Sequence, residues 1–275
     1  MHRSSSLLPI TFSKGGDAVI LTIDIRNDVL TLGGFEEDEL SFVSHFSTGQ
    51  AKTGDELAIR FLEALSLHNI ARETIGGVVV SSVVPPLNDG VKNAIRFVFG
   101  KEALFVGPGT KSGIGIQCDI PSSVGADIIA ACVATHSIYG APALVIDMGS
   151  ATIMTVINEK GAFVGTSIMP GVLMGLSALA EHTAQLPYVS LELPKNVIEK
   201  NTVDCMRSGA LYGNAAMVDG MIERIGEQFG RDLALYATGT MAEKVIPLCR
   251  HSITVDEQLV LKGLNIIYKK NSKNG

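Results

Sequence analysis

Apolar residues recur along the chain in two patterns, one typical of strands and one typical of helices. Continuous apolar runs predict buried strands at residues 18–24, 77–82, 103–106, 143–147 and 233–237, and shorter strands are expected at 29–32, 40–46 and 152–157. Apolar residues at helical spacing predict helices at residues 53–67, 91–99, 124–139 and 203–225. Strands that alternate with helices in this way indicate an α/β fold.

Turn and cap residues divide these segments. Gly33-Gly34 and residues 36–39 are expected to form turns. Thr53 and Glu56 match the capping box with which a helix begins. Residues 107–115 hold four glycines and one proline, so we expect a loop or a linker there.

A pattern that occurs twice suggests an internal duplication. One apolar strand ends in Asp24, and another ends in Asp147, 123 residues further along the chain. In both places a short turn of polar or small residues leads into a second strand. Duplication of a small α/β unit is the economical explanation, and a chance likeness of two hairpins is the alternative. We expect a first unit at 18–122 and a second at 123–275, after an N-terminal extension at 1–17.

The composition excludes several classes of protein. Hydrophobic residues make up 46% of the 275 residues and charged residues only 18%, against about 25% charged residues in an average globular protein. A disordered chain has the opposite balance, and no apolar run approaches the roughly 20 residues that span a bilayer. The net charge of −6 gives no broad basic surface for nucleic acid. We therefore expect the apolar excess in a core, a subunit interface or both.

The cysteines also carry information about the compartment. Cys118, Cys132, Cys205 and Cys249 form no CxxC pair, so neither a disulfide framework nor a zinc site is expected. A reducing cytoplasm is the natural location of such a chain. The first 17 residues lack the apolar length and cleavage site of a secretory signal, and we interpret them as a loose extension.

Three turns carry the candidate chemistry. Asp24 and Asp147 would lie at opposing strand ends across a cleft between two facing units, where carboxylates can hold a metal ion. Small and hydroxyl residues beside them let backbone amides approach phosphate. A third turn, at residues 237–240, follows a strand and precedes a helix, as nucleotide-binding turns do. Each turn alone is more often only a turn, but the three together point to phosphate handling.

Eight segments make the chain similar to a known family. They read DIRND (24–28), SSVVPPL (81–87), GPGTKSG (107–113), GAD (125–127), DMGSAT (147–152), MPG (169–171), NTVDCMRSGALYG (201–213) and ATGT (237–240). With these motifs in order over residues 18–270, the chain resembles the type III pantothenate kinases of the acetate kinase, sugar kinase and actin superfamily. The resemblance implies two duplicated RNase H-like, or actin-like, lobes with a nucleotide cleft between them.

The resemblance also implies a reaction. Members of this family transfer phosphate from ATP to the hydroxyl group of pantothenate and form 4'-phosphopantothenate, the first step towards coenzyme A. It further implies Mg²⁺, a monovalent cation (K⁺ or NH₄⁺) and a dimer whose substrate pocket lies at the subunit interface.

Roles at the substrate follow from the same resemblance. Asp127 would be the catalytic base, and Gly125 and Ala126 would line the substrate pocket. Thr202 would reach pantothenate that is bound mainly by the other subunit. The residues themselves leave structural alternatives open, since Asp127 suits the first turn of a helix and Thr202 suits a helix cap.

The turn residues receive their roles in the same way. The resemblance makes Asp147 a ligand of the monovalent cation, although a strand-end aspartate can also cap its own turn. Asp24 would also be a ligand of Mg²⁺. The residues that would bind ATP or its phosphates are Asp24, Asn27, Ser150, Thr152 and Gly239.

Several positions depart from the family pattern. The first loop of the family reads D-x-G-N-T, where this chain has Arg26 in place of glycine and Asp28 in place of threonine. Arg26 fills the space through which a backbone approaches phosphate, although a guanidinium can also bind phosphate. Ile128 replaces an arginine that contacts substrate, Cys118 replaces a tyrosine that contacts pantothenate, and Thr240 replaces a glycine.

These departures leave three functions open. The chain is an active kinase in which Arg26 and other groups compensate, or a subunit that completes the site of an intact paralogue through Thr202. The third alternative is a regulatory or ligand-sensing protein of the same fold that binds no ATP. Departures at four ligand-contacting positions, beside an intact segment at 201–213, favour the second function.

Overall fold

Two mixed five-stranded sheets form the frame of the molecule. The computed structural model describes residues 18–49 and 53–272, so the expected extension at 1–17 lies outside the described residues. The first sheet contains β1 (Val19–Ile25), β2 (Val29–Glu36), β3 (Glu39–Ser47), β4 (Ile75–Ser82) and β5 (Leu104–Phe105). The second contains β6 (Ala143–Met148), β7 (Ala151–Ile157), β8 (Phe163–Pro170), β9 (Ala234–Thr238) and β10 (Thr254–Val255).

The two sheets have the same strand order. The first runs β3-β2-β1-β4-β5 and the second runs β8-β7-β6-β9-β10. In each sheet the three strands that come first in sequence pair antiparallel, and the other two continue the sheet in parallel. β1 and β6 are therefore equivalent central strands. This equivalence confirms the α/β fold with two duplicated lobes.

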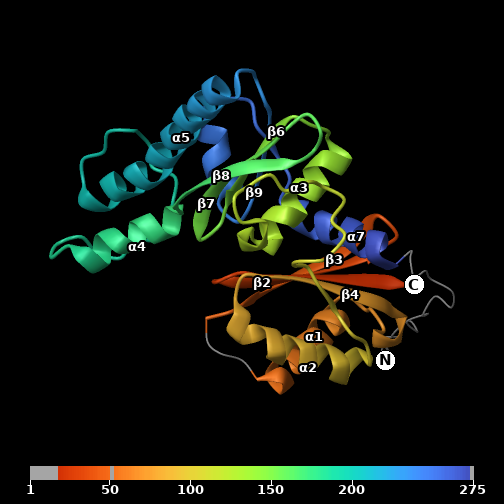
Figure 1. Cartoon of the computed structure of the whole chain (residues 1–275). Helices are drawn as coiled ribbons and strands as arrows, with labels where there is room; N and C mark the ends of the chain where they lie inside the picture. Colours follow the sequence, from red (N-terminus) through yellow and green to blue (C-terminus); the bar gives the residue numbers. More distant parts are fainter. Residues whose placement is uncertain (1–17, 50–52, 273–275) are drawn as a thin grey trace, which may run out of the picture.

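Helices form layers on both sides of the sheets (Figure 1). α1 (Gly54–Leu67) and α2 (Asn88–Phe99) cover the outer face of the first sheet, and together they form the first lobe. The second lobe consists of the second sheet with α4 (Val172–His182), α5 (Thr202–Phe229) and α6 (Ala242–Val245). α3 (Ala126–Ile138) and α7 (Leu259–Ser272) lie between the two sheets.

The faces of the central strands decide where their polar ends point. Ile23 of β1 belongs to the core under α1 and α2, so Asp24, the next residue, faces the layer between the sheets. Ile146 of β6 packs in the core toward α5, so Asp147 faces the same layer from the opposite sheet. The topology therefore turns the two aspartates toward one another.

A glycine lets α3 and α7 cross closely. A Cβ atom at Gly263 of α7 would collide with the backbone carbonyl of Ala130 on α3. We expect Gly263→Ala to lower the free energy of unfolding by about 1–3 kcal/mol, because the helices must separate. Gly213→Ala is a matched control, since that glycine lies within α5 with nothing near its Cβ position, and alanine should stabilise the helix by about 0.5–1 kcal/mol.

Urea unfolding of the two variants measures this difference. Equal stability of Gly263→Ala and the natural chain would contradict the close crossing of the helices.

The prediction of a turn at Gly33-Gly34 is wrong. Both glycines lie inside β2, which continues to Glu36, and the chain reverses before β3 begins at Glu39. A Cβ atom at Gly34 would collide with the ring of Phe42, its partner across β2 and β3. These glycines therefore serve close packing within the sheet. The turn expected at residues 36–39 is confirmed.

Helix starts agree with the predictions in one case and differ in another. The capping box of Thr53 and Glu56 at the start of α1 is confirmed. At α5 the cap is Asn201, whose side chain accepts a hydrogen bond from the backbone N–H of Asp204 at 3.0 Å. Thr202 is the first residue of the helix, so the alternative that made it the cap is wrong. Among the described residues no helix has the length and apolar character to cross a membrane.

Candidate functional site between the lobes

Arg26 joins the two strand-end aspartates. Its Nε atom donates to Oδ2 of Asp24 at 2.7 Å, and one terminal nitrogen donates to Oδ1 of Asp147, also at 2.7 Å. The aspartates are 4% and 7% exposed, and the Arg26 side chain is 16% exposed. The turns at Asp24 and Asp147 thus converge as predicted, but through a guanidinium that reaches from the first lobe to the second.

Local backbone geometry makes room for this arrangement. The N–H of Arg26 donates to the carbonyl of Val29 and closes a tight turn between β1 and β2. A Cβ atom at Gly149 would lie 3.2 Å from the Arg26 guanidinium. Gly239, with a φ of +93°, has a left-handed backbone, and a Cβ there would lie 2.7 Å from Oδ1 of Asp147. Two glycines of the second lobe therefore leave the space that the ion pairs occupy.

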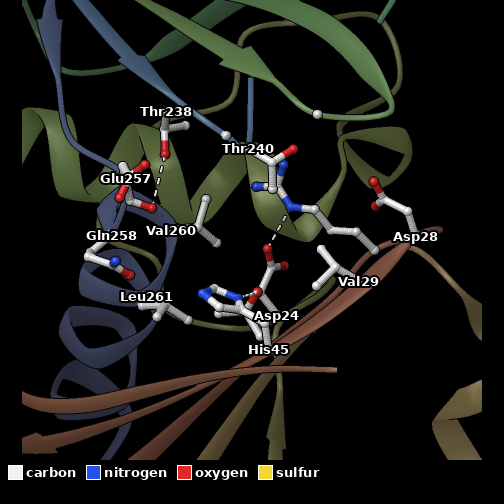
Figure 2. Close-up of a pocket in the computed structure, with 14 residues that line it drawn as sticks. Asp24, Asp28, Val29, His45, Thr238, Thr240, Glu257, Gln258, Val260 and Leu261 are labelled. Atoms are coloured by element: carbon white, nitrogen blue, oxygen red, sulfur yellow. Dashed lines mark hydrogen bonds and ion pairs between the residues drawn. The ribbon is translucent and has the colours of Figure 1, made fainter. Parts of the chain in front are cut away.

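A cleft of about 240 Å³ opens beside Arg26. Figure 2 shows Asp24 and Asp28 of the first lobe on one side of it and Thr238 and Thr240 of the second lobe on the other. The cleft is also lined by residues that the sequence patterns did not indicate, His45, Glu257 and Gln258. Asp147 and Asp127 are not among its lining residues. Arg26, which does line the cleft, contacts Asp147 directly.

Asp127 lies in the first turn of α3 and is 7% exposed. One carboxylate oxygen accepts a hydrogen bond from the N–H of Ile128 at 2.9 Å. The pKa of Asp127 is raised to about 6: burial is the largest cause, the Arg26 charge lowers the pKa, and the nearby Asp24 and Asp147 raise it. A carboxylate with a pKa close to neutral pH is suited to accept a proton in general base catalysis.

The raised pKa of Asp127 predicts a dependence of stability on pH. The folded chain holds the Asp127 proton up to about pH 6, whereas the unfolded chain releases it near pH 4. Stability from this group is therefore highest at low pH and is lost as the pH rises from about 4 to about 6. Asp127→Asn should stabilise the fold by about 3 kcal/mol at pH 8 and by about half of that at pH 5.

Urea unfolding at both pH values tests this expectation. Asp89→Asn is the matched control, because Asp89 lies in the first turn of α2 with its side chain 93% exposed, and it should give no such gain. If Asp127→Asn is less stable than the natural chain at pH 8, the burial of Asp127 and the raised pKa of its carboxyl group are contradicted.

The other predicted site residues lie in different surroundings. Asn27 is exposed, and its backbone carbonyl accepts a hydrogen bond from the Thr48 hydroxyl at 2.7 Å. Thr152 is buried with no hydrogen-bond partner for its hydroxyl, while Ser150 accepts a hydrogen bond at its carbonyl from Gly171. Gly239 lines the cleft, whereas Asn27, Ser150 and Thr152 do not.

The predicted substrate residues divide between two places. Gly125 and Ala126 form the start of α3, next to Asp127. Thr202 is exposed at the start of α5, outside the cleft. Figure 1 shows this end of α5 beside α4, on the outer side of the second lobe. The structure therefore does not bring Thr202 together with Asp127 of the same chain.

Solved structures with a similar fold are known. The chain matches ethanolamine utilization protein EutJ from Carboxydothermus hydrogenoformans with a TM-score of 0.52 at 15% identity, covering 90% of this chain and 89% of that chain. It matches MreB 5 of Spiroplasma citri bound to AMPPNP with a TM-score of 0.51 at 10% identity, covering 93% and 97% of the two chains. These likenesses concern the two-lobed, actin-like fold alone.

Sequence comparison gives the family. A sequence profile described as type III pantothenate kinase matches residues 20–224. A type III pantothenate kinase from Halalkalibacterium halodurans is 36% identical over 253 residues, which cover 92% of this chain and 100% of that protein. The same segment contains the converging turns, Asp127 and the start of α5. The chain belongs to the type III pantothenate kinase family.

Proposed function

We propose that this chain takes part in ATP-dependent phosphorylation of pantothenate, as the subunit that completes the active site of an intact paralogue. Family membership supports the reaction, and a kinase family implies ATP and a divalent metal ion. The product is 4'-phosphopantothenate, on the route to coenzyme A. The proposed role as a completing subunit rests on one observation. Arg26 forms ion pairs with both Asp24 and Asp147.

The charges around the chain's own cleft disfavour a nucleotide there. Asp24, Asp28 and Glu257 line the cleft together with Arg26, whose charge is already paired with two carboxylates. Phosphates placed beside these carboxylates meet like charges at short range. These features support the proposal that the cleft of this chain does not itself catalyse the reaction.

The surface around Thr202 supports assembly with another subunit. Large apolar side chains that are between 42% and 87% exposed gather on α4 and on the segment that leads to α5: Leu173, Met174, Leu179, Tyr188, Leu193, Val197 and Ile198. An exposed apolar surface of this kind marks an interaction site. Thr202 directly follows this segment and is itself exposed. A partner seated on the surface would therefore meet Thr202.

This surface gives a prediction about assembly. We expect Ile198→Glu to dissociate the assembly, because a charge would be buried at the subunit interface. Ile198 is 87% exposed in the single chain, so the fold itself should keep its stability. Leu67→Glu is the matched control: Leu67 is 78% exposed on α1 of the first lobe.

Light scattering after size-exclusion chromatography, on the chain co-purified with the paralogue, gives the masses. The proposed interface is wrong if Ile198→Glu keeps the mass of the assembly, or if Leu67→Glu dissociates it equally.

A regulatory or ligand-sensing role is the alternative that needs no turnover. Thermal unfolding with and without ATP and Mg²⁺ separates the two. A rise of the melting temperature with ATP and Mg²⁺ that is larger for the mixed assembly than for the paralogue alone supports the kinase role, and a shift caused only by other ligands supports sensing.

A further inference from the structure

We propose that the Arg26 guanidinium takes the place of a metal cation between Asp24 and Asp147, and that it excludes a divalent metal ion from these two aspartates. This inference deepens the proposed function, on which it rests for the kinase nature of the cleft. It gives a physical cause for the lack of turnover there, and it concerns this chain without any partner.

The guanidinium occupies the atoms that a bridging metal ion needs. Oδ2 of Asp24 and Oδ1 of Asp147 each accept a hydrogen bond from Arg26 at 2.7 Å. A metal ion shared by the two aspartates would have to displace these bonds or lie beside a permanent positive charge. Asp24 keeps one buried oxygen, Oδ1, without a hydrogen-bond partner. One free oxygen does not replace the several oxygen ligands that Mg²⁺ requires.

The surroundings fit a cation that is part of the chain. The side chains of Asp24 and Asp147 come from opposite sheets, and both are buried. Unpaired carboxylates at this depth would be unfavourable, so a positive charge has to stand between them. Gly149 leaves space for a guanidinium. In the described residues no group of three His, Cys, Asp or Glu side chains has the arrangement of a metal site.

The same reasoning covers a monovalent cation at Asp147. A cation there would compete with Arg26 for Oδ1 of Asp147, which already accepts its hydrogen bond. Asp127 on α3 is the third carboxylate that faces this group, and Asp28, His45 and Glu257 line the adjacent cleft. Arg26 contacts both strand-end aspartates. Removing it should therefore convert the site from an ion pair into a metal site.

Titration with Mn²⁺ alone tests the inference. Electron paramagnetic resonance reports free Mn²⁺, and no nucleotide, pantothenate or partner is added. We expect Arg26→Gly to bind Mn²⁺ with a Kd at least tenfold lower than that of the natural chain. The double variant Arg26→Gly with Asp147→Asn should lose this gain. Arg231→Gly is the matched control, because Arg231 forms an exposed pair with Glu159 at 2.8 Å, and it should bind Mn²⁺ like the natural chain.

Two results would overturn the inference. One is a natural chain that binds Mn²⁺ as tightly as Arg26→Gly, with binding lost in Asp147→Asn. The other is a folded Arg26→Gly that gains no binding. If Arg26→Gly fails to fold, Arg26→Gln, which removes the charge and keeps a shorter polar side chain, gives the same comparison. Failure here would leave the partner role open, because that role is measured by turnover of the mixed assembly.

Discussion

Arg26→Met is expected to lower the free energy of unfolding by about 3–5 kcal/mol at pH 8. Methionine fills similar space but leaves Asp24 and Asp147 buried and without their cation. Removing one partner of a buried ion pair costs more than the pair contributes, because the desolvated charge stays behind. Urea unfolding with two independent probes measures the loss.

Two control variants separate this effect from a loss of packing. Arg26→Met combined with Asp24→Asn and Asp147→Asn removes all three charges, and it should recover most of the stability. Arg231→Met removes an exposed pair with Glu159, and it should change the stability by less than about 1 kcal/mol. An Arg26→Met variant as stable as the natural chain would mean that the two aspartates do not need this cation.

The second large effect concerns activity of the mixed assembly. Thr202→Ala in this chain should lower kcat/KM for pantothenate by about 10- to 100-fold, the range of a lost hydrogen bond to a buried substrate group. The reason is that Thr202 would contact pantothenate in the partner's site. Asp127→Asn in the same chain should leave kcat/KM unchanged, because the chain's own cleft would not turn over.

The assay uses co-purified chains, with only this chain altered in each sample. Substitution of the corresponding aspartate in the paralogue should abolish activity, which identifies the working site. The opposite pattern, with activity lost in Asp127→Asn and kept in Thr202→Ala, would show that this chain's own cleft is the active one.

Local patterns were sufficient to predict the strand ends and the duplication. Asp24 and Asp147 could be predicted as equivalent because each follows a continuous apolar strand, and strand burial depends on nearby residues. The capping box at Thr53 is equally local. Where two good cap residues stand side by side, as Asn201 and Thr202 do, composition does not choose between them. The choice depends on which side chain reaches the N–H of Asp204.

Contacts between distant segments lay outside these patterns. Gly33-Gly34 looked like a turn because glycine favours turns, but the ring of Phe42 across the strand pair requires a residue without a side chain there. The spacing of Arg26 and Asp24 permits a local ion pair, whereas its pairing with Asp147 depends on how the lobes meet. His45 and Glu257 also line the cleft only because of how the lobes meet. They come from β3 and from the loop before α7, and no sequence motif marks either of them.

Turnover by the purified chain is the most direct test of the proposal that the cleft beside Arg26 has no activity of its own. For this chain alone, the rate of ATP-dependent phosphorylation of pantothenate should be at background. The co-purified pair should be more active than the paralogue alone. Turnover by this chain alone at about 1–100 s⁻¹, as is typical of kinases, would contradict both the silent cleft and the role as a completing subunit.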